Sequence, residues 1–457
     1  MDLYGPLFRH LLLPGWENLI RRRPTLARLH YLERTQWCSA DELFAIQAGA
    51  LRRLLRHAYA HVPFYRARFD AAGAGPGDVR GLEDLAELPL LSREQAQAAG
   101  DARRSTAPPY ADIAKATSGT MGRPLAFHYD RSSDHWRQAV KLRGYRWAGY
   151  RLGEPTLHYW GALYWPPPAP GRRIQIAADR FFKRERYLDC TERGPAQLER
   201  AAHAIRRQRP HVILCYAQAG ADLARTIVER GLRNWGTIPV LCGAERLLEA
   251  DRKLLQQAFG PALYETYGCR EVMLIGSECE AHDGLHVAVE NLVVEVLVRE
   301  KGGLRPARPG EVGEVVLTDL HNYGMPFIRY ANGDLAVAGK SERCLCGRAL
   351  PRLAAIEGRV TETLTNAQGG RVSGLIFNVI FAGELAEKVR QFQVVQHRDG
   401  AVTLRLVPSG HFDDAARAHI VRNCERHLSG VPVRTEVVPE IPLGASGKRQ
   451  VVVVERG

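Results

Sequence analysis

The sequence predicts an α/β protein with a large N-terminal domain of mostly parallel sheets flanked by helices, a β-rich subdomain, and a small, mobile α+β domain at the C-terminus. Short β-rich runs at residues 212–215 and 239–242 alternate with helical stretches at residues 219–230 and 247–259. That alternation is typical of parallel sheets connected by helices. With 457 residues, of which 45% are hydrophobic and 25% charged, the chain is long enough for two or more domains.

Residues 1–100 are expected to be helical and to form part of the large domain. Ser39 and Glu42 form a capping box before a helically spaced apolar pattern, and Val62-Pro63 should end that helix. The first segment is amphipathic and is followed by Arg21-Arg22-Arg23. We expect it to pack on the main domain; contact with a membrane surface is the alternative.

The core is expected over residues 101–357, with strands dominating between 285 and 340, and the small domain over residues 358–457. After Glu357-Gly358-Arg359 the chain has its own strand, strand, helix, strand order, at residues 393–397, 402–407, 413–428 and 433–438. Such a unit could move as a lid over the larger part.

Charge and cysteine content narrow the functional classes. The net charge is +13, but the 63 basic residues are spread along the chain, and only 8 of them are Lys, which indicates a general bias toward Arg. We therefore expect no nucleic-acid partner. No run of 18 apolar residues and no signal-peptide pattern occur, so we expect no transmembrane segment and a cytoplasmic location. Nine cysteines, an odd number, make structural disulfides unexpected.

The segment Thr117–Pro124 has the composition of a phosphate-binding loop. Its glycines let a backbone approach a phosphate closely, its hydroxyls can donate hydrogen bonds, and it lacks the Walker lysine pattern. A plain turn is the alternative at this point. The candidate phosphate ligands are Thr117, Ser118, Gly119, Thr120 and Gly122.

Three further motifs carry polar groups suited to a nucleotide. Tyr267 and Gly268 precede Glu271, an arrangement that could face a nucleotide ring and a magnesium ion. Asp334 follows a Gly turn, and an ionised Asp accepts hydrogen bonds from ribose hydroxyls. Lys448, in a Ser-Gly-Lys loop near the C-terminus, could stabilise charge that develops on a phosphate.

These four motifs, in this order, resemble the acyl-adenylate-forming superfamily, and within it the phenylacetate–CoA ligase branch and its capsular-polysaccharide-associated relatives. Further matching segments cover nearly the whole chain: Val62–Tyr65, Leu88–Glu94, Gly243–Glu245, Glu278-Cys279, Gly284–His286 and Cys344–Arg348. The resemblance implies an ATP-dependent ligase that forms acyl-AMP from a small carboxylic acid, releases pyrophosphate and passes the acyl group to CoA. An amine or hydroxyl of a sugar or small metabolite is the alternative acceptor, and a non-catalytic nucleotide-binding protein is the alternative of another class.

The resemblance also implies a role for each residue. The Thr117–Gly122 loop would hold the β- and γ-phosphates of ATP, Glu271 would help bind Mg²⁺, and Lys448 would be the adenylation lysine carried by the small domain. The nucleoside would contact Gly243, Ala244, Glu245, Tyr267, Gly268, Asp334 and the hinge residue Arg359. After Arg359 the chain departs from the branch: Val360-Thr361-Glu362 and Gly369–Ser373 replace its usual residues, which leaves the acceptor step open.

A metal site is predicted from cysteine and histidine spacing. Cys344 and Cys346 form one pair, and Cys279 has His282 and His286 downstream. Two such pairs can supply the four ligands of a structural zinc ion. Spacing does not choose between His282 and His286, and His286 could instead line the acyl pocket. We expect a monomer or a homodimer, and the aromatic residues Trp160, Tyr164 and Trp165 suggest a flat apolar acid.

Overall fold

The computed structural model describes most of the chain. It covers residues 3–117, 125–161, 170–191, 193–300, 303–340, 342–359, 363–368, 371–373, 388–443 and 450–455, together with 377, 380, 381 and 385.

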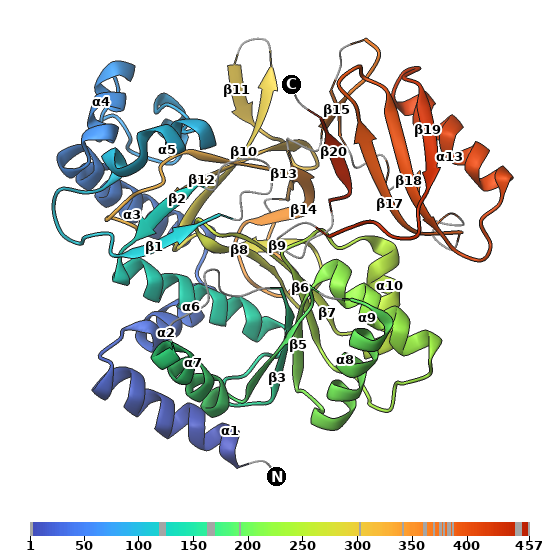
Figure 1. Cartoon of the computed structure of the whole chain (residues 1–457). Helices are drawn as coiled ribbons and strands as arrows, with labels where there is room; N and C mark the ends of the chain where they lie inside the picture. Colours follow the sequence, from blue (N-terminus) through green and yellow to red (C-terminus); the bar gives the residue numbers. More distant parts are fainter. Residues whose placement is uncertain are drawn as a thin grey trace.

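A 12-stranded sheet forms the centre of the large domain, and its strand pairing changes from parallel to antiparallel at β7 (Figure 1). Its first half is parallel, in the order β4, β3, β5, β6, β7. These strands span Glu185–Asp189, Thr156–Trp160, Val212–Tyr216, Val240–Gly243 and Leu263–Cys269. The predicted strands at 212–215 and 239–242 are therefore neighbours, as expected of alternating strands and helices.

Helices cover both faces of the parallel half. Ile213 and Cys215 of β5 pack in the cluster with α8 (Pro195–Gln208), α9 (Ala217–Glu229) and α10 (Glu249–Phe259). Val212 and Leu214 point to the opposite face, in the cluster that includes α6 (Arg131–Trp147). Burial on both faces explains why β5 and β6 are continuous apolar runs in the sequence.

The second half of the sheet is antiparallel and corresponds to the predicted β-rich subdomain. From β7 outward the order is β8, β9, β14, β13, β12, β10, β11. Their bounds are Met273–Glu278, Leu285–Val287, Arg352–Arg359, Tyr330–Ala338, Val312–Asp319, Leu292–Glu300 and Gly303–Pro306. A separate hairpin, β1 (Ile113–Ala116) with β2 (Ala126–Tyr129), lies beside it.

The N-terminal region is helical, as predicted. The Ser39–Glu42 capping box is confirmed at the start of α3 (Ala40–His61), and α4 (Pro63–Ala72) begins at the predicted break. The other helices are α1 (Tyr4–Leu7), the π-helical η1 (Phe8–Leu12) and η2 (Gly15–Ile20), α2 (Thr25–Thr35), η3 (Glu83–Glu87), α5 (Arg93–Ala99) and η4 (Gly100–Arg103). Phe8 and Leu13 pack in the main core, as expected for the first segment. No helix in the described ranges is both long and apolar enough to cross a membrane.

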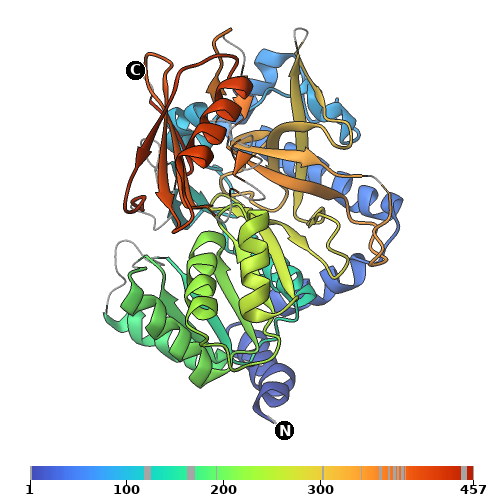
Figure 2. The same cartoon turned by 90° about the vertical axis from the view of Figure 1, so that its right-hand side faces the viewer.

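The C-terminal residues form a unit with its own core. The predicted element order is confirmed by β17 (Val389–Gln396), β18 (Val402–Pro408), α13 (Asp414–His427) and β19 (Val433–Val437), and β20 (Val452–Val454) completes the sheet. β15 (Thr363–Thr365) pairs with β16 (Arg371–Ser373). This unit lies above the helices of the parallel half (Figure 2). β14 of the large sheet runs to Arg359 and the C-terminal core begins at Leu364, so the predicted boundary between residues 357 and 358 lies inside β14, two residues before its end.

Candidate active site and metal centre

The candidate phosphate-binding loop connects the two strands of the β1–β2 hairpin. Thr117 stands at its base, where its backbone N–H donates to the Leu125 carbonyl at 3.1 Å. The Leu125 N–H donates in turn to Thr117 Oγ1 at 2.9 Å. Residues 118–124, and with them Ser118, Gly119, Thr120 and Gly122, lie outside the described residues.

Arg93, the first residue of α5, links this loop to Glu271. Its Nη2 donates to Thr117 Oγ1 at 2.6 Å, and its Nη1 lies 3.6 Å from Glu271 Oε1. Glu271 is buried and also accepts a hydrogen bond from the Tyr330 hydroxyl at 3.0 Å. Burial is the largest cause that raises the pKa of Tyr330, with the Glu271 charge next, so this phenol stays a neutral donor. Arg93 lies in the Leu88–Glu94 segment that supported the family resemblance, but sequence reasoning gave it no role.

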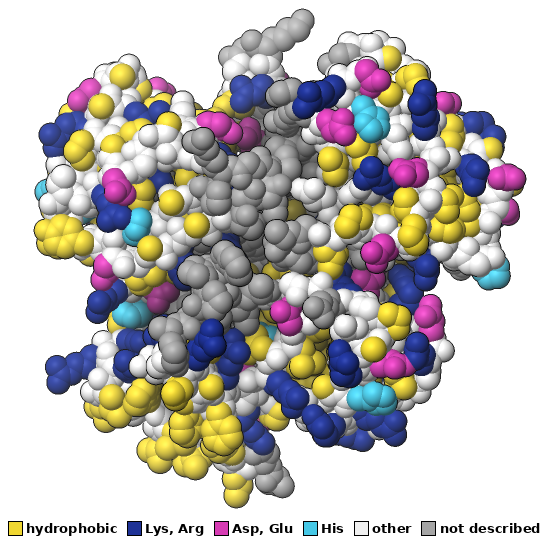
Figure 3. All heavy atoms as spheres, in the orientation of Figure 1, with side chains coloured by type: hydrophobic (Ala, Val, Ile, Leu, Met, Phe, Trp, Pro, Cys, Tyr) yellow, Lys and Arg dark blue, Asp and Glu magenta, His cyan; other side chains and the backbone are white. Residues whose placement is uncertain are grey.

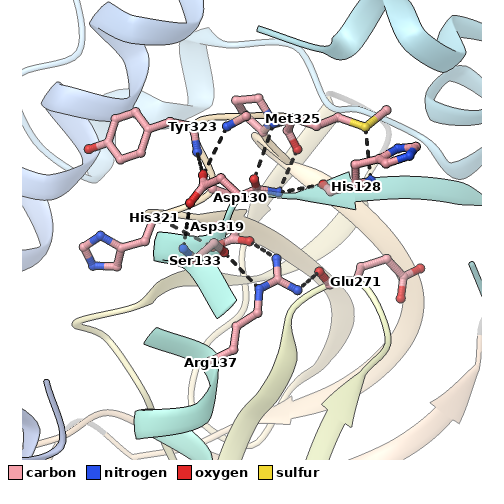
Figure 4. A network of polar contacts seen from close by, with 12 residues as sticks. His128, Asp130, Ser133, Arg137, Glu271, Asp319, His321, Tyr323 and Met325 are labelled. Atoms are coloured by element: carbon pink, nitrogen blue, oxygen red, sulfur yellow. Dashed lines mark hydrogen bonds and ion pairs between the residues drawn. The ribbon is translucent and has the colours of Figure 1, made fainter. Parts of the chain in front are cut away.

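A buried polar network holds the backbone of Glu271 in place (Figure 4). Arg137 of α6 donates from Nη1 to the Glu271 carbonyl at 2.5 Å, and it forms an ion pair with Asp319 at the end of β12. Asp130 caps α6 by accepting from the Ser133 N–H at 2.8 Å, and also accepts from the Tyr323 N–H at 3.0 Å. Because these groups are buried and mutually paired, the network fixes the β7–β8 turn relative to the antiparallel half.

Asp334 of β13 lies in a second buried cluster. Its Oδ2 accepts hydrogen bonds from the Tyr267 hydroxyl and from Asn332 Nδ2, both at 2.8 Å. The ring of Tyr267 packs in the hydrophobic cluster of the antiparallel half. Arg359 is the cross-strand partner of Asp334 on β14. The structure thus brings the predicted ribose ligand and the predicted hinge residue to adjacent strands.

Two glycines of the predicted nucleotide site have steric roles. A Cβ on Gly243 would lie 2.6 Å from Thr266 Oγ1, so glycine lets the end of β6 approach β7. A Cβ on Gly268 would lie 2.2 Å from the Met273 carbonyl oxygen, so the β7–β8 hairpin requires glycine at this position. Ala244 follows with φ of 65°, in the left-handed region, and places Glu245 so that Oε2 accepts the Gln218 N–H at 3.1 Å.

Four of the five predicted metal ligands lie together. The ligand atoms of Cys279, His286, Cys344 and Cys346 are all within 4.8 Å of one another. The Cys279 and Cys344 sulfurs are 3.8 Å apart, and Cys346 Sγ is 3.3 Å from His286 Nε2. His286 Nδ1 lies 3.0 Å from the Leu350 carbonyl, to which it donates, so Nε2 carries the free lone pair. Burial lowers the pKa of His286 to about 4, so its ring is in the neutral, ligating form.

His282 does not belong to this group. It sits in a tight turn with φ of 51°, and its Nδ1 lies 2.9 Å from Glu278 Oε1. Its ring packs against Tyr264, with the ring centres 4.9 Å apart. The expectation that His282 could complete the cluster is therefore corrected in favour of His286.

The chain is 30% identical over 351 residues to a phenylacetate–coenzyme A ligase of Aromatoleum evansii, covering 73% of this chain and 74% of that protein. It is 29% identical over 379 residues to the phenylacetate–coenzyme A ligase of Thermus thermophilus, covering 79% and 80% of the two chains. The chain belongs to the phenylacetate–coenzyme A ligase family. The family predicted from the ordered motifs is confirmed.

The C-terminal unit of this family member matches a family model of its own. Residues 364–455 match the CapK C-terminal domain. They include the four-stranded sheet, α13, β16 and all of β15 except Thr363.

Solved structures place the fold of this ligase-family chain among acyl-adenylate-forming enzymes. A 2-hydroxyisobutyryl-CoA ligase in the post-adenylation state, bound to 2-HIB-AMP, has a TM-score of 0.74 at 21% identity, covering 93% of this chain and 92% of that one. The same enzyme in the thioesterification state has a TM-score of 0.61 at 22% identity, covering 93% and 92% of the two chains. ATP-bound MatB from Rhodopseudomonas palustris has a TM-score of 0.53 at 17% identity, covering 76% of this chain and 68% of that one. The predicted fold class is confirmed.

Proposed function

We propose that this ligase activates a small carboxylic acid with ATP, forms an acyl-AMP with release of pyrophosphate, and transfers the acyl group to the thiol of CoA. The observation that carries the proposal is the match to phenylacetate–coenzyme A ligases over about three quarters of both chains. The Arg93 bridge between Thr117 and Glu271 supports it, because it joins a candidate phosphate-binding loop to a carboxylate.

In the proposed adenylation step, different site residues would bind different parts of ATP. The carboxylate oxygen of the acid attacks the α-phosphorus of ATP, and the bond to the pyrophosphate oxygen breaks. The enzyme's part is to align the two reactants and to neutralise charge. Thr117 and the loop after it would hold the phosphates, Asp334 would accept the ribose hydroxyls, and Lys448, outside the described residues, would lie on the α-phosphate.

Magnesium fits the Glu271 position. Mg²⁺ is bound in such sites through one or two carboxylates together with substrate phosphates. Glu271 offers one carboxylate, already oriented by Tyr330 and Arg93. The ion would supply neutralisation of charge on the phosphates.

A structural zinc ion fits the Cys279, His286, Cys344 and Cys346 cluster. Three thiol sulfurs and one imidazole nitrogen are a complete ligand set for a closed tetrahedral site. The cluster joins the β8–β9 hairpin to the segment between β13 and β14. Zinc would therefore stabilise the two strands that carry Asp334 and Arg359.

An aromatic or flat apolar acid suits the carboxyl ends of β3, β5 and β6. Trp160 packs edge-on against Tyr216 with ring centres 4.5 Å apart, and a Cβ on Gly243 would lie 3.7 Å from Trp160. Tyr164 and Trp165, the other aromatic residues predicted for this pocket, lie outside the described residues. The nine free cysteines suit a reducing compartment, so we place the enzyme in the cytoplasm, as a monomer or homodimer.

The proposal is tested by incubating the purified chain with ATP, Mg²⁺, CoA and a panel of aryl and alkyl acids, and by measuring acyl-CoA with mass spectrometry. Formation of a CoA thioester from at least one acid is the expected result. If acyl-AMP accumulates and CoA does not discharge it, CoA is the wrong acceptor, and amines or hydroxyl compounds must replace it. If neither product forms with any acid, the proposed activity is wrong.

A further inference from the structure

Helix α7 (Pro170–Lys183) has an apolar face that points away from the protein. Ile174, Ala177, Ala178, Phe181 and Phe182 follow the i, i+3, i+4, i+7, i+8 spacing of one helix face. All five are exposed, and the exposed fractions of Ile174, Phe181 and Phe182 are 71%, 77% and 55%. Such a face normally packs on the core, so its exposure requires another explanation.

The N-terminal helical segment adds a second apolar face beside α7. Leu7, Leu11, Trp16 and Leu19 are 48%, 64%, 44% and 76% exposed. The Tyr4 hydroxyl donates to the Phe182 carbonyl at 2.6 Å, which fastens the start of this segment to the end of α7. Figure 3 shows the hydrophobic side chains gathered over these two elements, at the lower left where Figure 1 places α1 and α7.

Basic residues flank both faces. Residues 170–186 contain six Arg or Lys and two acidic residues. One of those acids, Asp179, is paired with Lys183 at 2.8 Å, and the other, Glu185, lies 3.0 Å from the Tyr150 hydroxyl that donates to it. Arg172 and Arg173 at one helix and Arg21–Arg23 at the other are exposed. An apolar surface with a basic border is complementary to a layer of anionic lipid headgroups over acyl chains.

We propose that α7 and the N-terminal helical segment together bind the enzyme to the surface of an anionic phospholipid membrane, without spanning it. Phe181, Phe182 and Trp16 enter the boundary between headgroups and acyl chains, and the arginines contact the lipid phosphates. A second copy of the chain is a poorer partner, because a two-fold contact through this surface brings the same positive charges together.

The test is co-sedimentation of the full chain with phosphatidylcholine vesicles that contain or lack phosphatidylglycerol. The wild-type chain is expected to bind the anionic vesicles, and high salt is expected to release much of it. The double variant Phe181→Ser/Phe182→Ser is expected to bind these vesicles at least roughly tenfold more weakly than the wild type, because two exposed aromatic anchors are lost. Its pyrophosphate release in the absence of vesicles should equal that of the wild type.

Phe44→Ser is the matched control, since Phe44 is an aromatic residue of α3 that is 44% exposed. Phe44→Ser should bind vesicles as the wild type does. Ile174→Ser, a single substitution on the α7 face, should also weaken binding to anionic vesicles. Absence of wild-type binding to anionic vesicles overturns the proposal, as does full binding by the double variant. A wild-type dimer in sedimentation velocity that the double variant converts to monomer also overturns it, because a second copy then covers this surface.

Discussion

Replacing Arg93 with Ala is expected to impair adenylation strongly while leaving the fold intact. The change removes the 2.6 Å hydrogen bond to Thr117 Oγ1 and the 3.6 Å ion pair with Glu271. A hydrogen bond from a charged donor contributes about 1.5–3 kcal/mol. The ion pair adds little, because the Arg93 side chain is 33% exposed and solvent screens it.

If that energy is expressed in the transition state, kcat/KM for ATP falls roughly 10- to 150-fold. The assay is continuous detection of pyrophosphate with saturating acid and varied ATP. Arg93→Lys keeps the charge but not the two-pronged donor geometry, and it should give an intermediate value. Arg56→Ala is the control, because Arg56 is an exposed arginine of α3. A kcat/KM for Arg93→Ala within twofold of wild type, with an unchanged melting temperature, would refute the bridge between loop and carboxylate.

Three further predictions concern a buried carboxyl of β7, the nucleotide site and the metal centre. Burial, with the nearby Glu278 charge, raises the pKa of Glu265 from its usual value to about 7, so this carboxyl stabilises the fold below pH 4.5 and loses that contribution as pH rises through 7. Glu265→Gln should therefore be more stable than wild type at pH 8 by on the order of 3 kcal/mol and similar to it at pH 4.5, and equal urea midpoints at both pH values would contradict this. Asp334→Asn should raise the KM for ATP about tenfold or more, since an amide cannot accept as two carboxylate oxygens do, and an unchanged KM would exclude Asp334 from the ribose site. Cys344→Ser should lower bound zinc below one equivalent and the Tm by at least about 5 °C, whereas wild-type protein without zinc by elemental analysis would sink the metal assignment.

Local sequence signals predicted the elements whose conformation is decided locally. The Ser39–Glu42 capping box and the Val62-Pro63 break require only neighbouring residues, and both occur as expected. Strands β5 and β6 could be predicted as well, because burial on both faces gives continuous apolar runs.

Features that depend on long-range packing could not be predicted from the sequence. The choice of His286 over His282 is decided by the β8–β9 turn, which directs His282 toward Glu278. The bridge made by Arg93 depends on α5 meeting the β1–β2 hairpin and the β7–β8 turn, which no spacing reveals. Tyr267 was expected to contact the nucleoside, but its spacing did not reveal that its ring is buried and that its hydroxyl donates to Asp334.

The direction in which the apolar face of α7 points could not be predicted from its sequence pattern. The spacing from Ile174 to Phe182 is that of one face of an amphipathic helix, a face that usually packs on the core. Only their exposed fractions separate a buried stripe from an outward-facing one.

Exchange of labelled pyrophosphate into ATP, with a panel of carboxylic acids and without CoA, reports the adenylation step alone. We expect acid-dependent exchange that requires Mg²⁺ and falls by a factor on the order of 100 or more in Lys448→Ala, because the lysine stabilises charge at the α-phosphate. Exchange that no acid stimulates, or full exchange by Lys448→Ala, would contradict adenylation by this site.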